Sequence, residues 1–74
     1  MSLPYKALLA RRRRNLRQAL YEREMSGADL ALMMQVSRSY VSQLLGPRPC
    51  RPITERTRLI LERLLKLTSG ALDE

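Results

Sequence analysis

The chain has 74 residues, no histidine, a single cysteine and a formal charge of +7. A chain this short buries only about 60% of its unfolded surface, which favours a binding surface over a catalytic pocket. Without histidine, and with Cys50 alone, the sequence offers no metal-ligand cluster, no nucleophile–base set and no internal disulfide. We therefore expect one domain over residues 1–74 that is not an enzyme. It should take no cofactor, metal or small-molecule substrate, and should reside in the reducing cytoplasm.

Basic residues concentrate in the N-terminal two thirds of the chain. Residues 1–24 hold seven basic and two acidic side chains (net +5), residues 25–53 hold three and one (net +2), and residues 54–74 hold four of each (net zero). Such a field attracts polyanions, either a nucleic acid or an anionic membrane surface. Because the C-terminal part is neutral and its apolar residues are needed for a core, we expect no membrane binding.

Helical periodicity runs through the chain apart from one loop, which predicts an all-α fold. The first helix is expected from Pro4 to about Arg23, since proline suits a first turn. Arg12 falls on the apolar face of this helix, and a guanidinium is rarely buried without a partner. We therefore expect the core to begin near Leu16, with residues 1–10 projecting as an apolar overhang.

Residues 26–46 are typical of two short helices joined by a tight turn. Ser26 with Asp29 three residues later matches a capping box at the start of the first of these helices. Ser37 is the expected N-cap of the second helix, which should span residues 38–45. The residues expected to face inward are Leu30, Ala31, Met34, Val36, Val41, Leu44 and Leu45.

The rest of the chain predicts a loop, a last helix and a closing turn. Residues 46–52 contain three prolines, which forbid a regular helix and favour a stiff loop. The C-terminal segment 54–72 should hold a helix from the N-cap Thr54 to about Leu67 and a last turn at residues 71–72. The inward arc of this helix is expected to contain Ile60, Leu61, Leu64, Leu65 and Leu67. Leu59 lies outside that arc, among charged residues.

Several of these elements follow one known pattern. They are Leu30-Ala31, the turn residues Val36-Ser37, the segment Ser39-Tyr40-Val41-Ser42-Gln43-Leu44, the basic proline-rich loop and the closing segment 67–72. Together they resemble the lambda-repressor-like (Cro-like) helix-turn-helix family over about residues 16–72. This resemblance implies a compact DNA-binding domain of four to five helices in which residues 38–45 form the recognition helix.

The resemblance implies that this helix reads base edges in the major groove of double-stranded DNA. Ser37, Arg38, Ser39 and Gln43 match base-contacting positions, and Ser42 is small enough to admit a close approach. Arg38 suits guanine and Gln43 suits adenine. The alternative for each of these side chains is an ordinary solvated surface position.

A second set of residues is expected to contact phosphates. Gly27 and Ala28 form the helix start that meets the DNA backbone in the family, and Arg48 and Arg51 match loop positions with the same role. Tyr40 has a hydroxyl that could reach a phosphate. The alternatives are that Tyr40 packs on the core and that the loop arginines only provide solubility.

Three positions depart from the family pattern. Gly27 replaces a glutamine, so only its backbone N–H and the helix dipole are left to meet a phosphate. Gln35 replaces a turn glycine whose backbone is often left-handed. Leu20 and Leu45 together replace a buried Arg–Glu pair, so no charge is stranded.

The leading interpretation is a small transcriptional regulator or repressor of the phage or plasmid type, associated with the nucleoid. One module reads few bases, so we expect a homodimer on an operator with two half-sites. The candidate dimer contacts are the unexplained apolar residues Leu3, Tyr5, Leu8 and Leu59. The alternative function is a protein-interaction module, such as an antitoxin or accessory domain of the same fold. The run of residues 11–14, all arginine, points around the whole helix and is assigned to no single surface.

Overall fold

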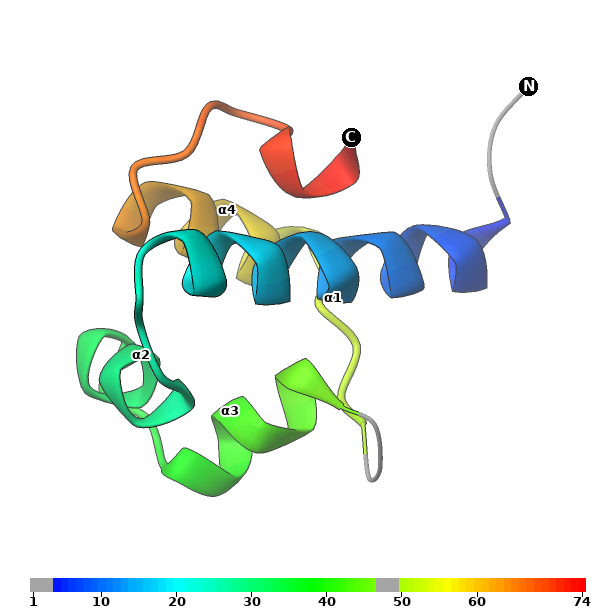
Figure 1. Cartoon of the computed structure of the whole chain (residues 1–74). Helices are drawn as coiled ribbons and strands as arrows, with labels where there is room; N and C mark the ends of the chain where they lie inside the picture. The colour runs from blue at the N-terminus through cyan, green and yellow to red at the C-terminus, as the bar shows by residue number, and fades with distance from the viewer. Residues whose placement is uncertain (1–3, 47–49) are drawn as a thin grey trace.

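The computed structural model describes residues 4–46 and 50–74 (Figure 1). Helix α1 spans Tyr5–Glu22, α2 spans Gly27–Met34, α3 spans Arg38–Leu45, α4 spans Glu55–Leu64, and a 3-10 turn, η1, spans Ala71–Asp73. The described residues contain no strand, which confirms the predicted all-α class. None of these helices has the length and apolar character that crossing a bilayer would require.

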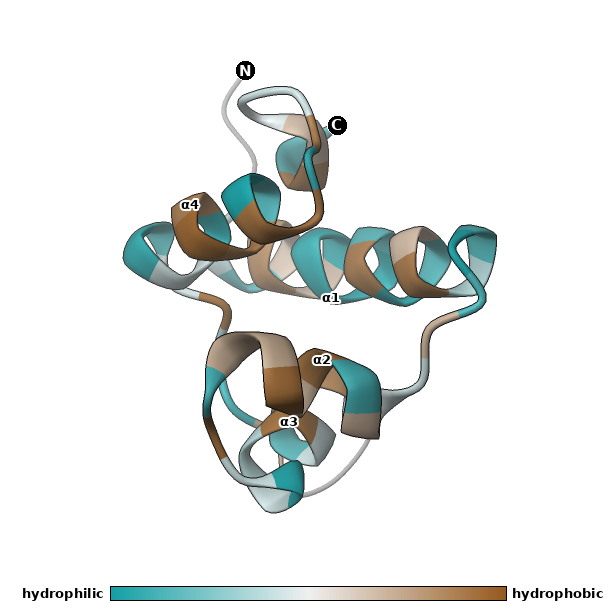
Figure 2. Ribbon diagram, turned by 90° about the vertical axis from the view of Figure 1, so that its left-hand side faces the viewer, coloured by the Kyte–Doolittle hydropathy of each residue, from teal (hydrophilic) through white to brown (hydrophobic). Residues whose placement is uncertain are grey.

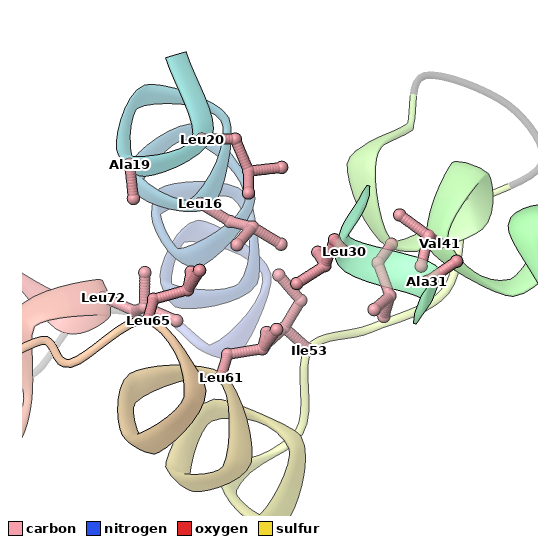
Figure 3. Close-up of a cluster of buried hydrophobic side chains, with 11 residues drawn as sticks. Leu16, Ala19, Leu20, Leu30, Ala31, Val41, Ile53, Leu61, Leu65 and Leu72 are labelled. Atoms are coloured by element: carbon pink, nitrogen blue, oxygen red, sulfur yellow. The ribbon is translucent and has the colours of Figure 1, made fainter. Parts of the chain in front are cut away.

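Helix α1 is the central element and lies between two layers (Figure 1, Figure 2). Helix α4 and η1 cover one side of α1, and α2 and α3 cover the other. Every element supplies buried apolar side chains to one continuous core (Figure 3). This core consists of Leu16, Ala19, Leu20, Leu30, Ala31, Val41, Leu44, Ile53, Leu61, Leu65 and Leu72. Since helices as short as α2 and α3 are marginal in isolation, their stability comes from this packing.

Side-chain caps begin α2, α3 and α4 at the predicted residues. Ser26, Ser37 and Thr54 each accept a hydrogen bond from the backbone N–H three residues later, at 3.1, 3.0 and 3.4 Å. The Asp29 carboxylate accepts the Ser26 backbone N–H at 2.9 Å, which completes the predicted capping box. Hydrogen bonding of the Asp29 carboxylate to the Ser26 backbone N–H, and to a smaller extent to the Ser26 side chain, lowers the pKa of Asp29. Caps of this kind contribute about 1 kcal/mol each.

Helices α1, α2 and α4 end in the same way, in Schellman motifs without glycine. The left-handed residues of these motifs are Glu24, Gln35 and Lys66, with φ of 53°, 59° and 56°. The residues that follow them are Met25, Val36 and Leu67. Each donates its N–H to the carbonyl five positions earlier, at 2.9, 3.0 and 2.8 Å, and packs its apolar side chain on the core. The turn back to the core therefore fixes where each helix stops.

This motif explains why the prediction for the last helix is too long. The helix was expected to continue to about Leu67, but α4 ends at Leu64. Lys66 turns left-handed, and Leu67 reaches the core from outside the helix. Leu67 is spaced in the sequence like the buried residues of α4, which is why the helical pattern included it, although it lies beyond the end of the helix.

The inner face of α4 is also narrower than predicted. Ile60 was expected to face inward but is 42% exposed, so that prediction is wrong. The buried face is centred on Leu61 and Leu65, and Ile60 lies to one side of it because successive helical residues are rotated by about 100°. Leu59 is 49% exposed and lies outside the inner face, as expected.

Arg12 is 4% exposed, so the prediction that α1 enters the interior only near Leu16 is wrong for this residue. Its guanidinium is fully partnered. Nε donates to the Asp73 carboxylate at 2.5 Å, Nη1 to the Ile53 carbonyl at 2.8 Å, and Nη2 to the Glu55 carboxylate at 2.9 Å. The bond to Asp73 outweighs the effect of burial and raises the pKa of Arg12. Burial is possible because the opposite charge comes from η1 and α4.

Glu62 and Arg58 of α4 extend this arrangement into an ionic cluster of Arg12, Glu55, Arg58, Glu62 and Asp73. Glu62 accepts Nη1 of Arg58 at 2.7 Å, the Gly70 N–H at 3.0 Å and the Leu72 N–H at 3.2 Å. Burial alone would raise the pKa of Glu62, but these N–H donors outweigh it and hold the pKa below its ordinary value of 4.5. No buried side-chain polar atom among the described residues lacks a partner. The ionic cluster thus fastens η1 to α1 and α4.

Replacing Arg12 by alanine should remove the cation that Asp73, Glu55 and the Ile53 carbonyl share. We expect the free energy of unfolding to fall by about 3 kcal/mol, as when one partner of a buried pair is deleted. The matched control is Arg14→Ala, which removes an exposed arginine of the same helix and should change stability by less than about 0.5 kcal/mol. Urea unfolding followed by circular dichroism measures both values. Equal losses in the two variants would contradict the role of Arg12.

The lowered pKa of Glu62 predicts loss of stability in acid. Because the folded carboxyl binds its proton more weakly than the unfolded one, the unfolded state takes up more protons as the pH falls. The contribution of Glu62 is therefore complete above pH 4.5 and is lost as the pH drops through the folded pKa. In Glu62→Gln the unfolding free energy should depend less steeply on pH below that value than in the natural chain. Glu22→Gln, which changes an exposed carboxylate, should keep the full steepness in urea titrations at each pH.

Candidate nucleic-acid interface

Helices α2 and α3 form a helix-turn-helix unit at the predicted positions. Leu30 and Ala31 of α2 are buried near Val41 of α3 (Figure 3). A Cβ atom on Gly27 would lie 3.5 Å from Cγ1 of Val41, so the first turn of α2 approaches α3 closely. Gln35 keeps the left-handed conformation that the turn demands, at a cost of about 1 kcal/mol for a residue with a side chain.

The outer flank of α3 is polar and open to solvent. Arg38, Ser39 and Ser42 are exposed, whereas Val41 and Leu44 on the opposite flank are fully buried. Three of the predicted base-contacting residues therefore share one flank. Of the remaining two, Ser37 is exposed at the N-terminal end of α3, and Gln43 is half-buried.

Arg51 returns from the loop directly onto this flank. Its backbone N–H donates to the Gln43 carbonyl at 2.7 Å, and its Nε donates to the Gln43 side-chain oxygen at 3.3 Å. Its guanidinium carbon lies 4.7 Å from the centre of the Tyr40 ring. Tyr40 is half-buried and packs against the core, as the alternative interpretation of this residue expected. The structure thus joins Tyr40, Gln43 and Arg51, which the sequence placed in two separate contact sets.

Arginines of α1 hold the C-terminal end of α3, a contact that the sequence did not predict. Arg13 donates from Nε to the Leu44 carbonyl at 3.2 Å, and Arg17 donates from Nε to the Leu45 carbonyl at 2.7 Å. The two preceding carbonyls accept the N–H groups of Gly46 and Arg51. All carbonyls of the last turn are therefore satisfied, and the positive guanidinium groups complement the negative end of the helix dipole. The sequence carries a faint signal of this contact, since Arg13 and Arg17 are four residues apart on one helix face.

Gly46 is required at the point where these arginines meet α3. Its backbone has φ 71° and ψ −166°, a conformation that is essentially restricted to glycine. A Cβ atom there would lie 3.0 Å from Cδ of Arg13 and 3.1 Å from Nη2 of Arg17. The close approach of α1 to the end of α3 therefore depends on the missing side chain.

The start of α2 is the predicted backbone anion site. The Asp29 N–H is used by the capping box, which leaves the first-turn N–H groups of Gly27 and Ala28 pointing out of the helix end. Both residues are half-buried. The Asp29 carboxylate stands in the same turn and offsets part of the positive field of the dipole.

The remaining candidate residues are spread over the molecule. Tyr5 on α1 is 61% exposed and Leu59 on α4 is 49% exposed, whereas Leu8 is half-buried. These dimer candidates come from two helices. Leu3, the fourth dimer candidate, and Arg48, a candidate phosphate contact, lie outside the described residues.

Residues 4–46 and 50–74 enclose no pocket and bring together no group of three acidic, cysteine or histidine residues suited to a metal. No protein-family model matches the chain, and neither the curated proteins nor the solved structures include a match. The resemblance to the lambda-repressor-like family therefore stays a prediction that rests on the motif residues.

Gly46→Ala should loosen the junction between α1 and α3. Forcing a side chain into this backbone conformation and against two arginines is expected to lower the unfolding free energy by about 2 kcal/mol. Gly70→Ala is the matched control, because Gly70 also has a positive φ, of 85°, but nothing within 4 Å of its Cβ position. Its loss should be about 1 kcal/mol. Thermal unfolding measures both variants, and a larger loss for Gly70→Ala would show that crowding at Gly46 is unimportant.

Proposed function

We propose that this protein binds specific sequences in double-stranded DNA, as a small repressor-type transcriptional regulator. The observation that carries this proposal is the two-sided character of α3: one flank is buried in the core and the other is polar, exposed and built of small residues and one arginine. An α-helix presented in this way fits the width of the major groove.

The proposed base contacts come from the outer flank of α3. They are Ser37, Arg38, Ser39, Ser42 and Gln43. Arg38 has the longest side chain of the exposed members and can donate two hydrogen bonds to one guanine, which discriminates bases by roughly 1–3 kcal/mol. The serines allow the helix backbone to approach the groove floor.

The proposed phosphate contacts surround that flank. They are Gly27, Ala28, Tyr40, Arg48 and Arg51. The net charge of +7 supports this assignment, because displacement of counterions from DNA by basic residues drives binding and makes it dependent on salt. Repression would then follow from occupancy, since a protein bound at an operator excludes polymerase.

Homodimer formation is part of the proposal, because a single helix in one major groove reads few base pairs. Tyr5 and Leu59 are exposed apolar side chains outside the helix-turn-helix unit and can supply the subunit contact.

A protein-interaction module is the second candidate function. Leu32 on α2 is 80% exposed, and Met33 beside it is 41% exposed, which supports an apolar contact next to the helix-turn-helix unit. Such a partner surface does not require Arg38, so the two functions respond differently to substitution of Arg38.

Selection of bound sites from a random duplex pool tests the proposal. The natural chain should enrich one half-site repeated with two-fold symmetry, and Arg38→Ala should lose about tenfold or more in affinity for that site. Arg63→Ala removes an equal charge from the exposed surface of α4 and should weaken binding by less than threefold. Absence of any enriched sequence, or equal effects of the two substitutions, would contradict DNA recognition through α3.

A further inference from the structure

The contact between Gln43 and Arg51 determines which hydrogen-bonding groups of Gln43 are available to a DNA base on the outer flank of α3. This inference rests on the proposed function and concerns which base Gln43 selects. Gln43 offers one acceptor oxygen with two lone pairs and one amino group with two donor hydrogens. The oxygen already accepts Nε of Arg51 at 3.3 Å, so a cationic donor occupies one lone pair, and the amino hydrogens have no partner among residues 4–46 and 50–74.

Several contacts keep Arg51 in this position. The backbone N–H of Arg51 is bound to the Gln43 carbonyl at 2.7 Å, which places the two side chains beside each other. The Tyr40 ring lies under the guanidinium at 4.7 Å and restricts its plane. The Gln43 oxygen is therefore already engaged without DNA, and the remaining side-chain N–H groups of Arg51, which have no partner among residues 4–46 and 50–74, can donate to a phosphate.

We propose that Gln43 and Arg51 together form a donor-only element that selects guanine and disfavours adenine. Recognition of adenine by a glutamine needs both ends of the amide, because its oxygen accepts from N6 while its nitrogen donates to N7. Guanine presents two acceptors in the major groove, O6 and N7, which match an amino group with two hydrogens. For Gln43 to pair with adenine, the N6 amino group would have to share the Gln43 oxygen with the cationic Nε of Arg51.

Arg51 is thus a positioning and specificity-determining residue as well as a phosphate contact. A lysine at this position would keep the positive charge for the phosphate. Lysine carries a methylene group where arginine carries Nε, so the hydrogen bond from that atom to the Gln43 oxygen would be lost. Charge and base preference are therefore separable by one substitution.

The experiment is site selection from the random duplex pool with the natural chain, Gln43→Ala, Arg51→Lys and Tyr40→Phe. The position at which Gln43→Ala loses its preference is the base pair that Gln43 reads. We expect the natural chain to prefer guanine over adenine there by about tenfold. Arg51→Lys should reverse this preference to adenine. Tyr40→Phe keeps the ring under Arg51 and should retain guanine.

The outcomes separate this inference from the proposed function. If no duplex sequence is enriched by the natural chain, the proposed function itself is wrong. If a sequence is enriched but the position read by Gln43 favours adenine, or Arg51→Lys still selects guanine, the donor-only element is overturned while DNA binding stands. The same holds if Gln43→Ala changes no position. Circular dichroism of each variant checks the fold, since Arg51 is exposed and its replacement by lysine should leave the melting temperature within about 2 °C.

Discussion

The arrangement of the molecule depends on hydrogen bonds from arginines of α1 to both of its neighbouring layers. Arg12 is buried against Asp73 and holds η1 on one side, while Arg13, the next residue, donates to the Leu44 carbonyl on the other side. Because successive residues of a helix point about 100° apart, two adjacent arginines reach different layers. Residues 11–14, all arginine, were expected to point around the whole helix and were assigned to no single surface. Two of the four have separate acceptors: Arg12 in the ionic cluster and Arg13 at the end of α3.

The starts of α2, α3 and α4 could be predicted because an N-cap acts within three residues of sequence. The end of α4 was expected at about Leu67 but lies at Leu64, because Lys66 takes a left-handed conformation that is usually found at glycine. The end of α1 was expected at about Arg23 and lies at Glu22. The burial of Arg12 was missed for a related reason: its partner Asp73 is 61 residues away, and only the tertiary fold brings the two together. Local chemistry was therefore predictable, and pairings across the chain were not.

The same distinction applies to the candidate interface. The exposed flank of α3 follows from helical periodicity alone, which is why Arg38, Ser39 and Ser42 were placed correctly on the surface. The contact between Gln43 and Arg51 depends on how the loop returns, and the sequence gives no direct sign of that path. The support that Arg17 gives to the end of α3 likewise requires knowledge of how α1 packs.

The glycine-free helix ends have a consequence for the evolution and engineering of this scaffold. Glu24 and Lys66 both carry a side chain in a backbone conformation that disfavours one, and both lie outside α3. Each such position lowers the free energy of unfolding by about 1 kcal/mol relative to glycine. The greater conformational freedom of glycine in the unfolded chain offsets only part of this difference. Substitution of glycine at either position can therefore raise the thermal stability of the protein without changing the side chains that α3 exposes.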